Sequence, residues 1–409
     1  MPPHAIYPRA IDRAACPWYT TLYSNGKSMG GSNMKYRTFG KLGIQGSAFG
    51  LGCMRFNGPA SGDSIIDESK AIGLIRRAID GGVTYLDTAY VYLDRTSEIV
   101  VGKALEGGYR DKVTIATKMP AEAVHNRQEM ENLLSEELRK LRTDHIDFYL
   151  MHGIDREKWE YFKSIGAPEF FDDMKKAGKI RFKCFSFHGP YEEFEYILRD
   201  YDWDMVQIQY NFMDVDNQAG TRGLELAGSL GIPVVIMEGL LGGRLAKAPS
   251  NVQALYDAFP VKRTPVEWAF RWLCDHPQVA TVLSGCNEAE QIDQNLAIFD
   301  TVEAGIMTDA EKKLMDDVRR AYISRTRIGC TGCRYCMPCP NGVNIPGVFS
   351  AWNQVSLYDT DPRHSWDLQR ILKNDEGANR CVECGACEAA CPQHLGIIEG
   401  LKAAWAELT

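Results

Sequence analysis

Several features that mark common protein classes are missing from this sequence. No apolar run approaches the length of a membrane-spanning helix. Basic residues are not in excess, since 46 Lys and Arg stand against 54 Asp and Glu and the net charge is −8. That balance argues against non-specific binding of nucleic acid, which depends on clustered cations. Residues 1–33 lack the continuous apolar segment of a secretory signal. We therefore expect a protein of the reducing cytoplasm, with no membrane or nucleic-acid partner.

Cysteine is abundant and unevenly distributed. Of the 13 cysteines, eight fall in two short runs in the last fifth of the chain. A Cys-x2-Cys-x2-Cys run lets three thiolates from one tight loop reach three corners of an iron–sulfur cube, and a fourth cysteine before a proline ligates a second cube. The sequence therefore predicts two [4Fe–4S] clusters. The eight candidate ligands are Cys330, Cys333, Cys336, Cys339, Cys381, Cys384, Cys387 and Cys391.

The spacing also predicts how the ligands divide, with the first three cysteines of each run joined by the last cysteine of the other. This arrangement resembles the two-cluster bacterial ferredoxins. In the first run only two residues separate Cys336 from Cys339, where the ferredoxin pattern has three, which leaves the exchange of fourth ligands open. Tetrahedral zinc and disulfides are the alternatives. Zinc needs no third cysteine at the same step, and disulfides need an oxidising compartment.

From Met34 onward, short β-rich runs alternate with amphipathic helical stretches. Eight such runs over about 290 residues predict a closed parallel (β/α)8 barrel, because both the count and the length match that architecture. A doubly wound sheet is the weaker alternative, since no Gly-x-Gly-x-x-Gly turn follows an early strand. The predicted strands are residues 46–52, 83–87, 112–118, 146–152, 180–186, 205–210, 234–237 and 279–284.

We expect three parts along the chain. Residues 1–33 have weak periodicity and many small or turn-forming residues, so they are interpreted as a flexible extension or as sequence added upstream of a start at Met34, and we assign them no function. Residues 34–325 form the barrel. Residues 326–409 form a ferredoxin-like α-helical iron–sulfur domain, in which residues 345–357 and 365–373 have helical periodicity.

Four polar residues follow the second, third and fourth predicted strands. Catalytic groups of such barrels stand at the carboxyl ends of the strands. The residues are Asp87, Tyr92, Lys118 and His152, in Leu-Asp-Thr-Ala-Tyr-Val-Tyr, Ala-Thr-Lys and Leu-Met-His-Gly segments. With their spacing, residues 35 to 305 resemble the aldo-keto reductases, and the whole chain resembles the subgroup with a C-terminal ferredoxin-like segment.

Chemical reasoning gives each of these residues a role. A hydride delivered to a carbonyl carbon leaves negative charge on oxygen, which needs a proton donor. A phenol with an ordinary pKa near 10 is a poor donor, so Lys118 is expected to lower the pKa of Tyr92 while Asp87 holds the lysine. A neutral His152 would orient the carbonyl. Tyr90 competes with Tyr92 for the donor role.

The resemblance also implies residues that bind a nicotinamide cofactor. Ser186 and Gln207 are expected at the nicotinamide amide, and Gln294 and Asn295 near the adenine. Met237 stands where the family often has an aromatic residue under the nicotinamide.

Charged residues bear on the phosphates of that cofactor. Arg244 or Lys247, after Gly242-Gly243, is expected to reach the pyrophosphate. Residues 285–291 contain no cation for a 2′-phosphate, so NADH is expected to be preferred over NADPH.

The leading interpretation is an NAD(P)H-dependent reductase of a small aldehyde or ketone. The clusters are expected either to stabilise the fold of a tail that buries little apolar core of its own or to exchange single electrons with a redox partner protein. The rival interpretation is an iron–sulfur electron-transfer or interaction protein on a barrel that has lost catalysis. His188, close to the fifth strand, is equally compatible with a substrate contact and with a loop position.

Overall fold

The computed structural model describes residues 34–56 and 67–409. Eight parallel strands close into a barrel, in the order β10, β3, β4, β5, β6, β7, β8, β9. The predicted barrel is confirmed, and each of the eight predicted runs contains or overlaps one of its strands. The strands are β3 Phe49–Gly52, β4 Tyr85–Asp87, β5 Thr114–Pro120, β6 Ile146–Ile154, β7 Ile180–Phe187, β8 Met205–Gln209, β9 Val234–Met237 and β10 Val279–Gly285. The predicted extension, residues 1–33, lies outside the described residues.

A hairpin that the sequence did not predict covers the amino-terminal end of the barrel. It pairs β1, Tyr36–Thr38, with β2, Gln45–Ser47, in antiparallel register. The run predicted as one strand, residues 46–52, is therefore divided between β2 and β3. Phe39, between the hairpin strands, places its ring 5.9 Å from Tyr85 and 5.5 Å from Phe148. The hairpin thus shields apolar side chains at the barrel floor from water.

Helices surround the barrel and bury their apolar faces against the strands. Helix α3 shows why: the side chain of Asn126 caps its amino terminus by accepting from the Glu129 amide, and Met130, Leu133 and Leu134 face inward. The helices of this part are α1 Glu68–Asp80, α2 Ser97–Ala104, α3 Arg127–Leu141, α4 Arg156–Ser164, α5 Ala167–Lys176, α6 Tyr191–Asp200, α7 Gly220–Ser229, α8 Ser250–Ala258, α9 Pro265–Asp275, α10 Ala289–Phe299 and α11 Asp309–Ile323.

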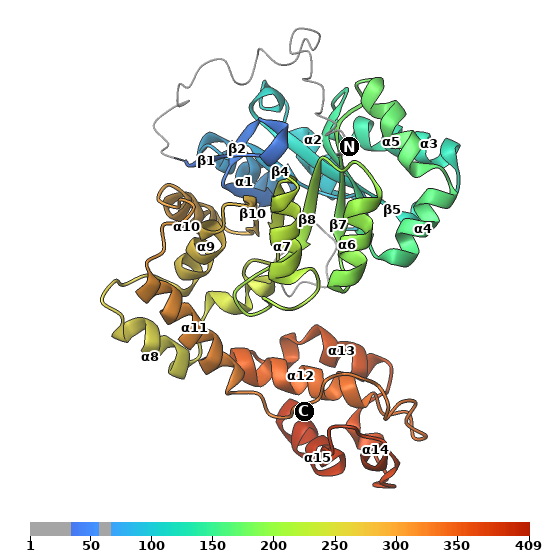
Figure 1. The fold of residues 1–409 in the computed structure, drawn as a ribbon, viewed down its shortest axis with the longest axis vertical. Helices are drawn as coiled ribbons and strands as arrows, with labels where there is room; N and C mark the ends of the chain where they lie inside the picture. Colours follow the sequence, from blue (N-terminus) through green and yellow to red (C-terminus); the bar gives the residue numbers. More distant parts are fainter. Residues whose placement is uncertain (1–33, 57–66) are drawn as a thin grey trace, which may run out of the picture.

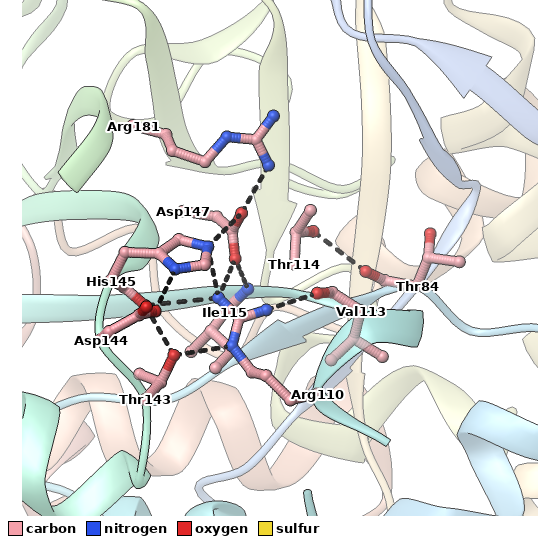
Figure 2. Close-up of polar contacts among 10 residues, drawn as sticks. All are labelled: Thr84, Arg110, Val113, Thr114, Ile115, Thr143, Asp144, His145, Asp147 and Arg181. Carbon is pink, nitrogen blue, oxygen red and sulfur yellow. Dashed lines mark hydrogen bonds and ion pairs between the residues drawn. The ribbon is translucent and has the colours of Figure 1, made fainter. Parts of the chain in front are cut away.

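A buried polar network ties together the amino-terminal ends of β5, β6 and β7 (Figure 2). The carboxylate of Asp147 accepts from Arg110 at 2.9 Å, from Arg181 at 2.7 Å and from the Ile115 amide at 3.0 Å. Only 1% of the Asp147 surface is exposed. Residues at this end of a barrel serve stability, because active sites form at the other end.

The cysteine-rich tail forms a separate helical body with its own core. Its helices are α12 Ile345–Tyr358, α13 Trp366–Lys373, α14 Ala386–Ala389 and α15 Ile397–Leu408. Both predicted helical stretches are present, as α12 and α13. Val348, Phe349 and Leu401 lie in the core between α12 and α15. Figure 1 shows the tail, in orange and red, beyond α11. Among the described residues, no helix is both long enough and apolar enough to cross a bilayer.

Candidate active site and cluster cavities

The carboxyl ends of the strands surround a cavity of about 410 Å³. This volume lies within the range of small-molecule sites, and the place is where barrels of this type bind ligands. Asp87, Tyr92 and His152 all line it. The segment that follows β9, residues 238–246, forms part of the rim and is called the β9 strap below.

Lys118 lies at the centre of the four predicted catalytic residues. Its ammonium donates to Asp87 Oδ1 at 2.6 Å, to the Thr88 carbonyl at 2.7 Å and to the Tyr92 hydroxyl at 3.3 Å. All three ammonium protons therefore have an acceptor. The ring of Tyr92 meets the ring of His152 edge-on, with centroids 5.9 Å apart. Because Tyr92 accepts from the lysine, its own proton remains available to a molecule in the cavity.

Burial sets the protonation of these groups. It raises the pKa of Tyr92 above its ordinary value, and Lys118 opposes the rise without reversing it, partly because Asp87 adds to it. Lys118 therefore lowers the pKa of the phenol, as the sequence predicts, but burial, which the sequence did not show, outweighs the lysine and the net pKa of Tyr92 is raised. Burial, with Lys118 and His188 adding to it, lowers the pKa of His152 to about 3. His152 is consequently neutral near pH 7.

Tyr90, the competing tyrosine, does not reach the cavity. Its hydroxyl donates to Glu136 at 3.4 Å, and its ring lies between the charged ends of Arg95 and Lys140, 4.2 and 4.4 Å from the ring centroid. The geometry therefore leaves Tyr92 as the tyrosine beside Lys118.

Three of the predicted cofactor residues stand together on neighbouring strands. Ser186 on β7 pairs in register with Gln207 on β8, and Gln207 donates to the sulfur of Met237 on β9 at 3.7 Å. Gln207 and Met237 line the cavity. The side-chain amide oxygen of Gln207, Oε1, is buried and has no hydrogen-bond partner among the described residues. A buried acceptor without a partner, at the wall of a cavity, fits a ligand amide such as that of nicotinamide. Ser186 accepts from the Gly153 amide at 2.8 Å and keeps its hydroxyl proton free.

The other predicted cofactor residues do not line the cavity. Gln294 is exposed on α10. Asn295 is buried behind the wall, where its amide donates to Ser284 Oγ at 3.1 Å and Cys286 Sγ at 3.3 Å. Arg244 lies on the β9 strap near Tyr358 of the tail.

Two charged residues at the cavity were missed by the sequence reasoning. Arg55, after β3, packs its side chain against Gly285, where an added Cβ would lie 2.9 Å from Arg55 Cγ. It also lies near Gly242 of the β9 strap and, among the described residues, has no ion pair or hydrogen-bond partner. Glu238 lines the same cavity. The signal in the sequence that could have identified Arg55 is an arginine within six residues of the end of the first barrel strand.

The eight cysteines of the tail line two adjacent cavities. One is bordered by Cys330, Cys333, Cys336 and Cys391. The other is bordered by Cys339, Cys381, Cys384 and Cys387, with Cys336 at the shared wall. All eight are free thiols. The cavities group the cysteines as their spacing predicts, with the last cysteine of each run reaching the other run.

The geometry of these cysteines suits clusters better than single ions. A zinc ion needs its thiolates to converge at about 2.3 Å from one point. Within residues 34–56 and 67–409, no three His, Cys, Asp or Glu side chains are gathered closely enough to hold one metal ion. Each cavity is instead lined by at least four cysteines, and four is the number of cysteine ligands that a [4Fe–4S] cube needs.

Comparison with known proteins agrees with the geometry. Residues 48–305 match the sequence model of the aldo/keto reductase family. The chain belongs to this family. Residues 329–395 match a 4Fe-4S dicluster domain, so this aldo/keto reductase carries a C-terminal iron–sulfur domain of ferredoxin-like type.

Relatives resemble the barrel. The aldo-keto reductase YhdN of Bacillus subtilis is 36% identical over 160 residues, which span 36% of this chain and 45% of the relative. The uncharacterized oxidoreductase YqkF of Bacillus subtilis is 25% identical over 331 residues, or 71% of this chain and 100% of the relative.

Solved structures share the fold. The holo form of aldo-keto reductase AKR11C1 from Bacillus halodurans is 25% identical, has a TM-score of 0.59 and covers 70% of this chain and 96% of its own. An aldo-keto reductase from Klebsiella pneumoniae in complex with NADPH is 23% identical, with a TM-score of 0.56 and coverage of 70% and 95%.

Proposed function

We propose that this aldo/keto reductase reduces a small aldehyde or ketone with NADH or NADPH, and that Tyr92 donates the proton. The observation that carries the proposal is the contact of Lys118 with both Asp87 and the Tyr92 hydroxyl, at 2.6 and 3.3 Å, beside a cavity that Tyr92 lines. A reduced nicotinamide supplies hydride to the carbonyl carbon, and the protein must then neutralise the oxygen.

Each of the four residues contributes one part of that neutralisation. Tyr92 transfers its phenolic proton to the carbonyl oxygen, and Lys118 stabilises the phenolate that is left. Asp87 fixes the lysine in place. Neutral His152, edge-on to Tyr92, orients the carbonyl by donating a hydrogen bond to its oxygen. Burial raises the pKa of Tyr92 and so favours the protonated phenol, which is the form that the reaction consumes.

The test compares two tyrosines two positions apart. Tyr92→Phe should lower kcat by about 10²- to 10⁴-fold, the usual contribution of a positioned acid. Tyr90→Phe is the matched control and should keep most of the activity, because its hydroxyl contacts Glu136 outside the cavity. Steady-state rates with a panel of aldehydes and ketones measure both. Equal losses in the two variants would contradict the assignment of the proton donor.

For the cofactor, we propose that Ser186 and Gln207 bind the nicotinamide amide over Met237. Arg55 is the candidate cation for the pyrophosphate, because among the described residues it is the arginine that lines the cavity, beside Gly285 and Gly242. Arg55→Met should weaken binding of NADH and NADPH alike in calorimetry, while Arg55→Lys should restore part of it. Gln294, Asn295 and Arg244 keep their predicted roles near the adenine and pyrophosphate as expectations.

We also propose that NADH is preferred. The two backbone amides that directly precede α10, and that an anion at the start of this helix could otherwise use, already donate to the side chain of Gln291, from Asn287 at 2.9 Å and from Glu288 at 3.3 Å. Glu288 adds negative charge and is paired with Lys70 at 2.6 Å. Dissociation constants for NADH and NADPH decide the matter, and tighter binding of NADPH would contradict the preference.

We propose that the tail holds two [4Fe–4S] clusters, one in each cysteine-lined cavity, in a protein of the cytoplasm. A second candidate function, electron exchange with a redox partner, is favoured by the exposure of Cys333 and Cys384, one at each cavity. An anaerobic titration with NADH and no carbonyl separates the two roles. Reduced clusters, seen by electron paramagnetic resonance, would support electron transfer; oxidised clusters beside carbonyl-dependent NADH consumption would support a structural role.

A further inference from the structure

The β9 strap has two faces with different neighbours. One face lines the mouth cavity, and the other is apolar. Leu245 is buried in an apolar cluster beneath the strap, and Leu240 and Leu241 pack against the same cluster. The cavity face consists of Glu238, Gly239, Leu240, Gly242 and Gly243.

The apolar cluster beneath the strap includes a residue of the iron–sulfur domain. This residue is Tyr358, the last residue of α12, and it is buried there together with Tyr322 of α11 at a ring distance of 5.6 Å. Charged groups of the barrel face its hydroxyl as well. Burial raises the pKa of Tyr358, Asp214 adds to the rise and Arg244 of the strap opposes it. Tyr358 therefore contacts the strap's apolar cluster and lies near its arginine.

Polar contacts hold the end of α12 in this position. Arg325 donates to the Ser356 carbonyl at 2.7 Å and pairs with Asp359 at 2.5 Å. The same guanidinium donates to Asn251 Oδ1 at 3.1 Å. Asn251 belongs to α8, which begins four residues after the strap. Arg325 thus joins the tail to the helix that anchors the strap's carboxyl end.

Two non-glycine residues of the strap have energetically unfavourable backbone dihedral angles. Glu238 and Leu241 have φ angles of 59° and 49°, in the left-handed region that side chains disfavour. Such conformations persist only where surrounding contacts enforce them. The apolar cluster beneath the strap, to which Leu245 and Tyr358 both belong, is therefore part of what keeps the strap in shape.

We propose that the ferredoxin-like domain clamps the β9 strap through Tyr358, so that affinity for the nicotinamide cofactor depends on intact clusters. The inference rests on the proposed function for the cavity but concerns a different residue, in a different domain. A tail held together by metal loses its shape when the metal is removed. Tyr358 would then leave the strap, and the cofactor would have to order it on binding. Tyr358 is a positioning residue, because it does not line the cavity.

The first experiment measures NADH affinity by calorimetry, together with iron and sulfide content, in the full-length protein. Tyr358→Ala should retain its iron and bind NADH about tenfold more weakly, the cost of re-ordering two or three strap side chains. Trp366→Ala is the matched control, an aromatic of the same domain whose surface is 69% exposed. It should change the affinity by no more than about twofold, as exposed substitutions usually do. Unchanged affinity in iron-replete Tyr358→Ala, or an equal loss in both variants, would overturn the clamp.

The second experiment needs neither a variant nor a cofactor. Hydrogen exchange of peptides covering residues 238–246 is compared before and after anaerobic removal of iron by a chelator, with β5 peptides as the internal control. Faster exchange in the strap alone is expected. Strap exchange that does not respond to iron removal would refute the clamp. A wild-type protein that binds neither NADH nor NADPH would instead refute the proposed function, and strap exchange would still decide the clamp.

Discussion

Removing the charge of Lys118 should show how much the buried ion pair of the candidate active site contributes to folding. The ammonium and the Asp87 carboxylate are 1% and 3% exposed and 2.6 Å apart. Lys118→Met leaves Asp87 buried without its cation, and the second carboxylate oxygen already lacks a hydrogen-bond partner among the described residues. Breaking a buried pair in this way costs about 3–5 kcal/mol of folding free energy. Replacing both partners by apolar groups, as in Asp87→Leu/Lys118→Met, should cost far less, since no unpaired charge remains.

The loss in Lys118→Met should also depend on pH. Burial raises the pKa of Asp87 in the wild type despite the lysine, and loss of the lysine raises it further. A carboxyl group whose pKa is raised in the folded state costs no folding stability at pH values below its ordinary pKa of about 3.9. It costs stability increasingly as the pH rises from there toward the folded-state pKa. The single variant should therefore be closer to the wild type at pH 5 than at pH 8.

Pulsed hydrogen exchange along a urea gradient, read in peptides from β4 to β6, measures barrel unfolding without assuming that the tail unfolds with it. The double variant serves as the control for lost packing. Equal losses in the single and double variants, or a loss in the single variant that is the same at pH 5 and pH 8, would refute the reasoning that an uncompensated Asp87 charge is the cause.

Three further predictions address other parts of the molecule. Burial, reinforced by Glu98, raises the pKa of Glu137 well above its ordinary value. The folded protein therefore loses stability as the pH rises above about 4.3, the ordinary pKa of a glutamate. Glu137→Gln should accordingly raise the melting temperature more at pH 8 than at pH 5. Asp147→Ala removes the buried carboxylate that accepts from Arg110 and Arg181 in the network of Figure 2. It should destabilise the barrel by about 3–5 kcal/mol, with KM unchanged in the fraction that is folded. Cys384→Ala should lower the iron content by about half if two clusters are present, whereas Cys184→Ala, in the barrel core, should leave it unchanged.

Local patterns were sufficient to predict much of this protein. The periodicity of apolar residues indicates which side of each strand or helix is buried. Eight repeats of a strand followed by a helix then predicted a closed (β/α)8 barrel. Asp87, Lys118 and His152 could be placed at one mouth because the carboxyl ends of parallel strands in a barrel all point the same way. The cysteine runs carry their chemistry in their spacing, so the iron–sulfur domain needed no tertiary information.

What the sequence could not supply depends on contacts between distant segments. Periodicity does not say which loops meet across a barrel mouth, so the approach of Arg55 to Gly285 came only from the structure. The net direction of the Tyr92 pKa required the burial of the phenol, which outweighs the visible charge of Lys118. Whether Tyr90 or Tyr92 faces the cavity depended on side-chain direction in one loop. The sequence alone determined the two folds and the candidate site residues, whereas the membership of Tyr358 in the apolar cluster beneath the β9 strap, which joins the two folds, exists only in three dimensions.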